Sequence, residues 1–296
     1  IENLQRADSI AQKGKSNQYG VVKHNQTAFT NLLELQKRLV LKTYRTSEYD
    51  VFKVYEPKQR TVYRLPYFPD RITHHAIMNV LEPIFVATFT TDTYSCIKKR
   101  GIHSLAGKLR KSLSNVDQTT YCLKFDIVKF YPSVDHDILK SLLRRKFKDS
   151  DLLWLLDEII DSAPGLPIGN YLSQYFANFY LTYFDHWIKE KLRIKHYFRY
   201  ADDIVILHHD KAFLHQTLSE IREYLQNNLS LQIKSNYQVF PVSARGIDYV
   251  GYVFYHRHTR LRKSIKKRFA RKVKSNPNKA SIASYQGWAK HANCKH

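Results

Sequence analysis

Residues 199–207 read RYADDIVIL, and two adjacent aspartates, Asp202 and Asp203, stand between an aromatic stretch and a run of β-branched apolar residues. The flanking runs HYFRY and IVIL are both typical of strands, which predicts a hairpin with the acids at its tip. Aspartate is also an ordinary turn residue that hydrogen-bonds its own backbone. The stretch alone therefore leaves two interpretations open, a structural turn and a functional pair of acids.

A third acid belongs to the segment YCLKFDIVKFYPSVDHDILKSLLRR, residues 121–145. Its first residues alternate between apolar and polar, as in a half-buried strand, and Asp126 falls on the face opposite the apolar set. Pro132 ends this strand, and Ser133 or Asp135 can cap a following helix. That helix is expected to bury Ile138, Leu139, Leu142 and Leu143.

If this strand lies beside the hairpin in one antiparallel sheet, carboxylates remote in sequence converge on one point. Such a cluster of like charges is unfavourable unless cations neutralise it. Mg²⁺ suits it, because that ion takes carboxylate oxygens and completes its shell with waters and substrate phosphates. Two such ions about 4 Å apart activate an attacking hydroxyl and stabilise a leaving pyrophosphate. The pattern predicts a template-directed nucleotidyl transferase.

The charge of the chain indicates a polyanionic partner. Lys and Arg total 48 against 26 acids, a net charge of +22, and no acid follows Asp248. No apolar run approaches the roughly 20 residues of a membrane-spanning helix, and no signal peptide is visible, so a cytoplasmic location is expected. Three cysteines without CxxC spacing predict no disulfide framework. The terminal cluster of His291, Cys294 and His296 is more typical of a basic tail than of a metal site.

Blocks along the whole chain resemble the motifs of reverse transcriptases, in the same order. VYEPKQR and DRITHHAI resemble the fingers motifs, EPIFVATFTTDTYSCIKKRGIH the next block, and KFDIVKFYPSVD the first catalytic motif. GLPIGNYLSQYFANFYL, RYADDIVIL, SLQIK and RGIDYVGY resemble the other palm motifs, and LRKSIKKRFARKVK and SYQGWAKHA the thumb. The chain resembles in particular the reverse transcriptases of diversity-generating retroelements, which copy a template RNA with errors at adenines.

The resemblance implies an α+β fold of the right-hand polymerase type. Residues 1–118 would form the fingers and 119–255 the palm, an antiparallel sheet backed by helices, with a helical excursion around 140–165. Residues 256–296 would form a short, basic, helical thumb.

The resemblance also assigns the chemistry to particular residues. The metal ligands would be Asp126, Ile127 through its carbonyl, Asp202 and Asp203. Lys234 would donate a proton to the leaving pyrophosphate, although a simple surface lysine is an equal alternative. Residues that would contact the incoming nucleotide are Lys58, Arg60, Arg64, Arg71 and Tyr131. The ring of Tyr131 would exclude a 2′-hydroxyl, its alternative being a packed aromatic, and each cation is also typical of a solvated surface.

The segment GLPIGNYLSQYFANFYL predicts a glycine turn that leads into a buried helix. Most reverse transcriptases carry Gln-Gly-x3-Ser-Pro at the position of four residues here, Ile168, Gly169, Ser173 and Gln174. The Ile and Gln departures are the pattern of diversity-generating enzymes and make group II intron maturases less probable. We expect these four residues to lie beside the template base and to set fidelity.

Two further elements would hold nucleic acid. Tyr249, Val250 and Gly251 resemble the primer grip, where relatives often carry Phe-Leu-Gly. The segment HRHTRLRKSIKKRFARKVK predicts a helix rather than a basic tail, because four apolar residues recur every four positions: Leu261, Ile265, Phe269 and Val273. Its contacts with phosphates would depend on salt and involve Arg262, Lys263, Lys266, Lys267 and Arg271.

These inferences together predict an RNA-directed DNA polymerase that makes adenine-mutagenic cDNA with two Mg²⁺ ions, for which Mn²⁺ can substitute. The expected partners are template RNA, primer, dNTPs and a small basic accessory variability protein, a helical oligomer. One alternative is a defence-associated or other prokaryotic reverse transcriptase. Another is a noncatalytic RNA-binding module, which the presence of all three acids disfavours.

Overall fold

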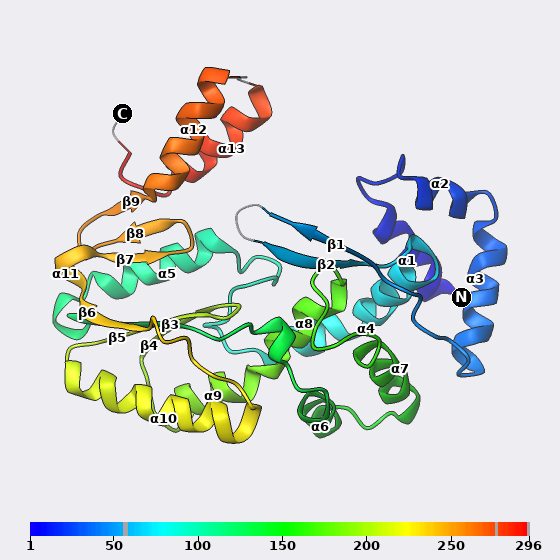
Figure 1. The fold of residues 1–296 in the computed structure, drawn as a ribbon, viewed down its shortest axis with the longest axis horizontal. Coiled ribbons are helices and arrows are strands. Elements are labelled where there is room, and N and C mark those ends of the chain that lie inside the picture. The colour runs from blue at the N-terminus through cyan, green and yellow to red at the C-terminus, as the bar shows by residue number, and fades with distance from the viewer. Residues whose placement is uncertain (56–58, 276–277, 295–296) are drawn as a thin grey trace. The chain divides into compact units, whose positions relative to one another are not determined.

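The computed structural model describes residues 1–55, 59–275 and 278–294 (Figure 1). It divides into two compact units that each take up several stretches of the chain. The first unit comprises Ile1–Phe89, Lys129–Tyr183 and Asn228–Leu231, and the second Thr90–Val128, Phe184–Asn227 and Gln232–His296. No helix among the residues described is both long and apolar enough to cross a membrane.

The first unit consists mostly of helices around one short hairpin. Its elements are α1 (Glu2–Gln12), α2 (Tyr19–Asn25), α3 (Ala28–Val40), β1 (Asp50–Val54), β2 (Arg60–Arg64), a π-helical turn (Tyr67–Arg71), α4 (Ile72–Thr88), a 3-10 turn (Tyr131–Ser133), α6 (His136–Lys146), α7 (Ser150–Ile160) and α8 (Tyr171–Tyr180). Strands β1 and β2 pair antiparallel. Phe85 of α4 packs its ring 5.2 Å from that of Phe179 in α8 and 5.7 Å from that of Phe147, which joins these helices in one aromatic core.

The capping prediction for α6 is confirmed at Asp135, whose carboxylate accepts a hydrogen bond of 3.0 Å from the Ile138 amide. Leu139, Leu142 and Leu143 are buried as expected, whereas Ile138 is half-buried.

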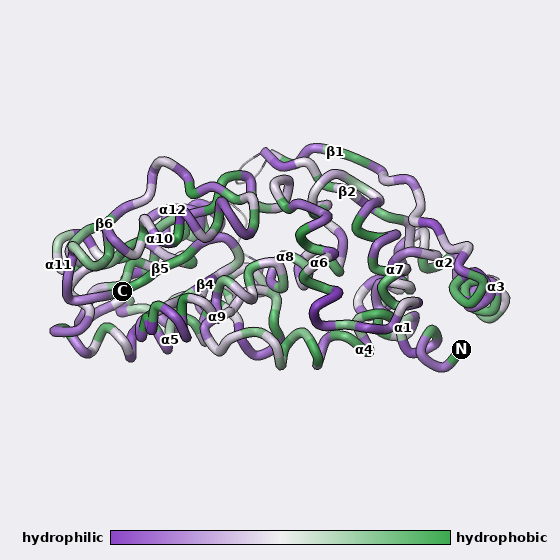
Figure 2. Tube along the Cα trace, turned by 90° about the horizontal axis from the view of Figure 1, so that it is seen from below, coloured by the Kyte–Doolittle hydropathy of each residue, from purple (hydrophilic) through white to green (hydrophobic). Residues whose placement is uncertain are grey.

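The second unit is built on a four-stranded antiparallel sheet in the order β4-β5-β3-β6. Its strands are β3 (Tyr121–Asp126), β4 (His196–Tyr200), β5 (Asp203–His208) and β6 (Gln238–Pro241), and its helices include α5 (Ile102–Leu113) and a 3-10 turn (Val116–Gln118). Helices α9 (Thr182–Glu190) and α10 (Lys211–Leu229) lie on one side of this sheet, and α5 lies on the other (Figure 1). One end of α9 and one end of α10 belong to the first unit. Strand β5 is hydrophobic over most of its length (Figure 2), because helices cover both faces of the sheet.

The C-terminal part of the second unit begins with α11 (Val242–Arg245) and a three-stranded sheet of β7 (Ile247–Tyr249), β8 (Tyr252–Phe254) and β9 (Thr259–Leu261). Helices α12 (Lys263–Ser275) and α13 (Lys279–Ala289) follow. Phe269 of α12 and Tyr285 of α13 bring their ring centroids to 4.8 Å. The predicted helix is thus confirmed from Lys263 on, while Leu261 ends β9 and Val273 is 42% exposed.

One hydrophobic core holds the second unit together. It combines Leu109 of α5, Val205 of β5 and Tyr252 of β8 with residues of β3, β6 and β9. Cys122 lies inside this core, and Cys96 and Cys294 are exposed; all three are free thiols.

Candidate active site

Two of the three aspartates occupy directly opposed positions at one end of the four-stranded sheet. Asp126, the last residue of β3, pairs in register with Asp203, the first residue of β5. Asp202 stands beside them in the two-residue loop between β4 and β5, which the pairing of Tyr200 with Asp203 closes. The first loop residue, Ala201, has a φ of 54°, the positive value that tight hairpin turns require. The predicted hairpin and its antiparallel neighbour are both confirmed.

Each strand-borne carboxylate has a lysine beside it. The Lys234 ammonium lies 3.3 Å from Oδ2 of Asp126, and the Lys234 amide donates to the Asp126 carbonyl at 2.9 Å. The Lys124 ammonium lies 3.5 Å from Oδ1 of Asp203. Lys124 precedes Asp126 by two residues and therefore points to the same face of β3. That spacing was the available signal for Lys124, which the sequence prediction did not single out.

The environment of Asp203 disfavours its charge. Burial raises the pKa of Asp203 to about 7, with Lys124 opposing the rise and the charges of Asp126 and Asp202 adding to it. Its Oδ1 atom is buried and accepts no hydrogen bond from the described residues. A buried carboxylate oxygen beside further carboxylates is a donor set that fits a hard divalent cation.

Within the part of the chain that the structure describes, no group of three or more His, Cys, Asp or Glu side chains could enclose a metal ion. The three predicted acidic ligands, Asp126, Asp202 and Asp203, therefore do not form one such group, and their role in metal binding stays a prediction. Ile127, whose carbonyl is a predicted metal ligand, directly follows Asp126. It forms an isolated antiparallel β-bridge with Ile233.

A fully buried ion pair lies next to the loop between β4 and β5 that carries Asp202. Arg199 of β4 and Asp185 of α9 are both 0% exposed, and Nε of Arg199 donates to Oδ1 of Asp185 at 2.8 Å. The hydroxyls of Thr93 and Tyr197 donate to the same carboxylate at 2.9 and 2.6 Å. Nη1 of Arg199 donates to the Ala201 carbonyl at 3.1 Å, which fixes the residue before Asp202. An arginine inside an apolar strand was the signal for this network, which the sequence prediction missed.

Of the three predicted primer-grip residues, Tyr249 ends β7, and Val250 and Gly251 form the turn between β7 and β8. Tyr249 is fully buried, and its hydroxyl donates to the Asp203 carbonyl at 2.9 Å. Val250 and Gly251 have φ values of 42° and 92°, as both central residues of a type I′ turn must. A Cβ atom on Gly251 would overlap the Trp288 ring of α13. The turn is therefore held between the β4–β5 hairpin and the C-terminal helices.

A polar path joins Asp203 to the start of α12. The Lys124 ammonium that pairs with Asp203 also donates to the Asp248 carbonyl at 2.6 Å. The carboxylate of Asp248 accepts from Nε of Arg262 at 2.6 Å, and the Arg262 amide donates to the Gly251 carbonyl at 3.0 Å. Arg262 is thus engaged within the protein. The other predicted thumb residues are exposed: Lys263, Lys266, Lys267 and Arg271.

In the first unit, the loop before α8 is hydrogen-bonded to the turn that begins at Tyr131 and to strand β2. The Leu166 amide donates to the Tyr131 carbonyl, and the Tyr63 amide of β2 donates to the Ile168 carbonyl, each at 2.8 Å. A Cβ atom on Gly165 would lie 2.6 Å from the Tyr131 carbonyl, and one on Gly169 would lie 2.5 Å from that of Tyr63. Both glycines have positive φ. The loop that carries Ile168 and Gly169 is therefore bonded to the turn that begins at Tyr131. Ile168 is half-buried, and on α8 Ser173 is buried and Gln174 is exposed.

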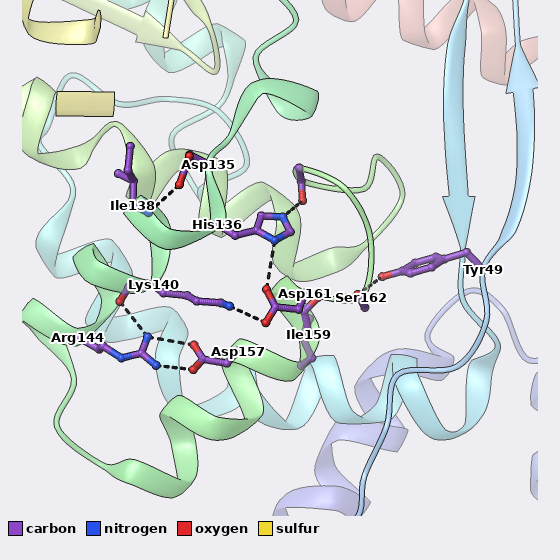
Figure 3. Close-up of polar contacts among 11 residues, drawn as sticks. Tyr49, Asp135, His136, Ile138, Lys140, Arg144, Asp157, Ile159, Asp161 and Ser162 are labelled. Carbon is purple, nitrogen blue, oxygen red and sulfur yellow. Dashed lines mark hydrogen bonds and ion pairs between the residues drawn. The ribbon is translucent and has the colours of Figure 1, made fainter. Parts of the chain in front are cut away.

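Helices α6 and α7 brace this loop (Figure 3). One nitrogen of the His136 ring lies 2.9 Å from the Gly165 carbonyl and the other 3.2 Å from the carboxylate of Asp161. Lys140 donates to the same Asp161 carboxylate at 2.5 Å, and Tyr49 places its hydroxyl 2.7 Å from that of Ser162. The backbone of the predicted fidelity loop is therefore fixed from two helices.

The predicted nucleotide-binding cations also lie in the first unit. Arg64 and Arg71 both line a cavity of about 200 Å³ together with Gly169 and Tyr171. Arg64 pairs with Asp50 of β1, and Arg60 is exposed at the start of β2. Lys58 lies outside the described residues.

Known proteins resemble this chain in both sequence and fold. The family model described as "Reverse transcriptase (RNA-dependent DNA polymerase)" matches residues 56–254, more than half of the chain. Protein YkfC of Escherichia coli strain K12 is 23% identical over 256 residues, which cover 70% of this chain and 67% of that protein. Nuclear intron maturase 4 of Arabidopsis thaliana mitochondria is 28% identical over 141 residues, 44% of this chain and 17% of the maturase.

Solved telomerases share the fold at low identity. Candida albicans telomerase, in complex with a fragment of telomeric RNA, superposes with a TM-score of 0.56 at 10% identity, over 78% of this chain and 51% of its own. A truncated apo telomerase of Candida tropicalis gives 0.54 at 10% identity, over 79% and 60%. The chain spans about half to three fifths of these telomerase chains. The predicted α+β right-hand polymerase fold is confirmed.

The family match includes all three acids and the loop before α8. The chain belongs to the reverse transcriptase family, the RNA-dependent DNA polymerases.

Proposed function

We propose that this chain synthesises DNA on an RNA template at the site formed by Asp126, Asp202 and Asp203. The observation that carries the proposal is the opposed pair of Asp126 and Asp203, with Asp202 in the adjoining turn, in a chain of the reverse transcriptase family. Two Mg²⁺ ions bound there, or Mn²⁺ in their place, would activate the primer hydroxyl and stabilise the leaving pyrophosphate.

Within this proposal the protein's own groups divide the work. The carboxylates, together with the Ile127 carbonyl, hold the cations. Lys234, beside Asp126, protonates the pyrophosphate as it leaves. The Lys124 ammonium offsets the charge of Asp203 before cations bind, since a buried carboxylate without a partner is costly. Arg199 keeps the turn in the conformation that presents Asp202.

The substrate contacts we propose follow the family motifs. The triphosphate would be bound by Lys58, Arg60, Arg64 and Arg71, since guanidinium forks match phosphate oxygens. Tyr131 would exclude the 2′-hydroxyl, and the hydrogen bond from Leu166 to its carbonyl supports a fixed position for that residue. The exposed cations of α12 would contact the duplex backbone.

We further propose the diversity-generating subtype, which makes errors opposite template adenines. Support comes from Ile168 and Gln174, which stand where most reverse transcriptases carry Gln and Pro. Ile168 removes a polar anchor and Gln174 adds a flexible hydrogen-bonding side chain, so a correct pair gains less over a mispair. The partners of this subtype would be a structured template RNA and a small basic accessory protein. The RNA would bridge the two positively charged proteins.

Primer extension on a defined RNA template tests the polymerase function. Asp126→Asn and Asp202→Asn are expected to lose incorporation by at least a thousandfold while retaining RNA binding. Asp137→Asn, which changes an exposed carboxylate on α6, is the matched control and should leave activity unchanged. Full activity in either folded active-site variant contradicts the assignment.

Deep sequencing of the cDNA tests the subtype. Ile168→Gln with Gln174→Pro is expected to lower misincorporation opposite adenine more than opposite the other bases. About 1.4 kcal/mol of regained discrimination corresponds to a tenfold lower error rate. An active double variant with the original adenine error rate rules out this mechanism.

A further inference from the structure

We propose that the first unit carries a binding site for single-stranded RNA in the cavity between its N-terminal residues 15–31 and residues 64–71. The cavity has a volume of about 1040 Å³. The inference deepens the proposed function, because it rests on the chain copying RNA and assigns one segment of that RNA to the first unit.

The lining of this cavity is basic and contains no acid. Its cations are Lys15 and Lys23 on one wall and Arg64 and Arg71 on the other, and the two arginines are shared with the triphosphate site proposed above. Arg64 is paired with Asp50, whereas Lys15, Lys23 and Arg71 make no ion pair with any residue that the structure describes. Like charges gathered without a counter-charge repel one another, and an anion between them relieves that repulsion.

Arg71 and Lys15 lie close enough to other titratable groups to shift the pKa values of those groups. Burial lowers the pKa of Lys15, and the charge of Arg71 lowers it further. Burial, together with the charges of Arg71 and Lys15, lowers the pKa of His75 to about 4. Burial is the larger cause of both pKa shifts, and the neighbouring positive charges add to it, which agrees with the geometry of an anion site.

The cavity also offers groups for bases. Tyr19, a lining residue on α2, is 81% exposed, so its ring is accessible to a base. Gln18 and Gln26 add amide groups that can donate and accept hydrogen bonds. A positively charged groove with an accessible aromatic ring is the usual construction of sites for single-stranded nucleic acid.

The walls of the cavity are rigidly built. Gly20 lies so close to Tyr67 that an added Cβ atom would be 3.0 Å from the Tyr67 Cβ. The His24 ring stacks on Phe68 with 5.4 Å between the ring centroids, and the Tyr67 hydroxyl donates to the Asp8 carbonyl at 3.2 Å. Because these contacts are made within the protein itself, RNA would bind a preformed surface and lose less conformational entropy.

An RNA strand fits these features better than a free nucleotide does. The cations come from both walls, and the aromatic ring stands exposed on α2. Successive phosphates of a strand can meet cations on both walls while one base stacks on Tyr19.

Fluorescence anisotropy with a labelled, unstructured RNA 12-mer tests the inference, using the full chain in EDTA without dNTPs. Lys15→Ala with Lys23→Ala removes two phosphate contacts, each contributing about 0.7 to the slope of log K against log salt. We expect the slope to fall by about 1.4 and the affinity at 0.1 M salt to fall about 25-fold. The matched control is Lys13→Ala with Lys37→Ala, two exposed lysines of the same unit outside the cavity, which should change the affinity less than twofold.

The aromatic contact has its own pair of variants. Tyr19→Ala is expected to weaken RNA binding about tenfold through lost stacking. Phe29→Ala, which removes another exposed aromatic on α3, should have no effect. All these side chains are solvent-accessible, and unchanged thermal unfolding would verify that the variants fold.

Three results overturn the inference. The first is equal weakening by the cavity variants and the control lysines, which would mean nonspecific attraction. The second is loss of labelled dATP binding in the cavity variant with RNA affinity unchanged, which would mean a nucleotide site. The third is full RNA affinity in both cavity variants. Because the assay needs no catalysis, failure of the proposed polymerase activity would appear separately, in primer extension.

Discussion

Removing the charge of Asp185 should destabilise the second unit more than any surface substitution. In Asp185→Asn the Arg199 guanidinium stays buried and charged, because arginine does not release its proton in proteins. Breaking a fully buried ion pair by removing one partner costs about 3–5 kcal/mol. Here both side chains are 0% exposed, and Thr93 and Tyr197 lose part of their hydrogen-bond acceptor as well. We therefore expect the free energy of unfolding to fall by about 3–5 kcal/mol.

Thermal unfolding measures this loss. For domains of 150–250 residues 1 kcal/mol corresponds to about 2–4 °C, so the melting temperature should fall by about 6–10 °C even at the lower conversion. The control is Asp161→Asn, which removes an exposed partner of Lys140 and should cost about 1 kcal/mol or less.

A second variant separates stability from turn geometry. Arg199→Lys retains the charge but not the planar fork, so it loses the hydrogen bond to the Ala201 carbonyl. Primer extension should therefore fall at least tenfold at a temperature where the variant is folded. A loss below about 1 kcal/mol in Asp185→Asn, measured by urea unfolding, would refute the assigned role of the buried pair.

Three further outcomes are expected. Tyr131→Val should raise the use of rNTPs relative to dNTPs in single-nucleotide extension, and an unchanged ratio removes Tyr131 from the gate. Gly251→Ala should lower the melting temperature by several degrees, because the residue has a φ of 92° and its new methyl group meets Trp288, whereas Gly107→Ala, with no heavy atom within 4 Å of the new methyl, should not. Burial, then the charges of His75 and Arg71, lowers the pKa of His74 to about 3, so its contribution to stability is present above pH 6.5 and is lost as pH falls. Urea unfolding at pH 7 and pH 5 should differ by about 2 kcal/mol from this residue, and His74→Leu should reduce the difference by that amount.

Local patterns in the sequence predicted the elements that carry the acids. The alternation around Asp126 and the two β-prone runs around Asp202 were sufficient, because strand period and hairpin turns are set by neighbouring residues. The pairing of Lys124 with Asp203 and of Arg199 with Asp185 could not be read in this way, since it depends on the register of strands and helices remote in sequence.

The sequence also did not predict how the chain divides between the two units. Residues 129–183 belong to the first unit although they follow directly on the strand that carries Asp126. No change of composition marks that point, because both units use similar amphipathic helices. The predicted boundaries at 118 and 255 describe fingers, palm and thumb, and they stay a prediction.

The path from Lys124 through Asp248 to Arg262 has a consequence for protein engineering. A thumb exchanged between two reverse transcriptases by joining them at the start of α12 would separate Arg262 from the Asp248 that holds it. Joining them before β7 would move both residues together and leave the hydrogen bonds to the four-stranded sheet to restore, among them those from Lys124 to the carbonyl at position 248 and from Tyr249 to the carbonyl of Asp203. Because a backbone carbonyl accepts the bond from Lys124, the recipient can supply that contact with a lysine two residues before the aspartate that corresponds to Asp126.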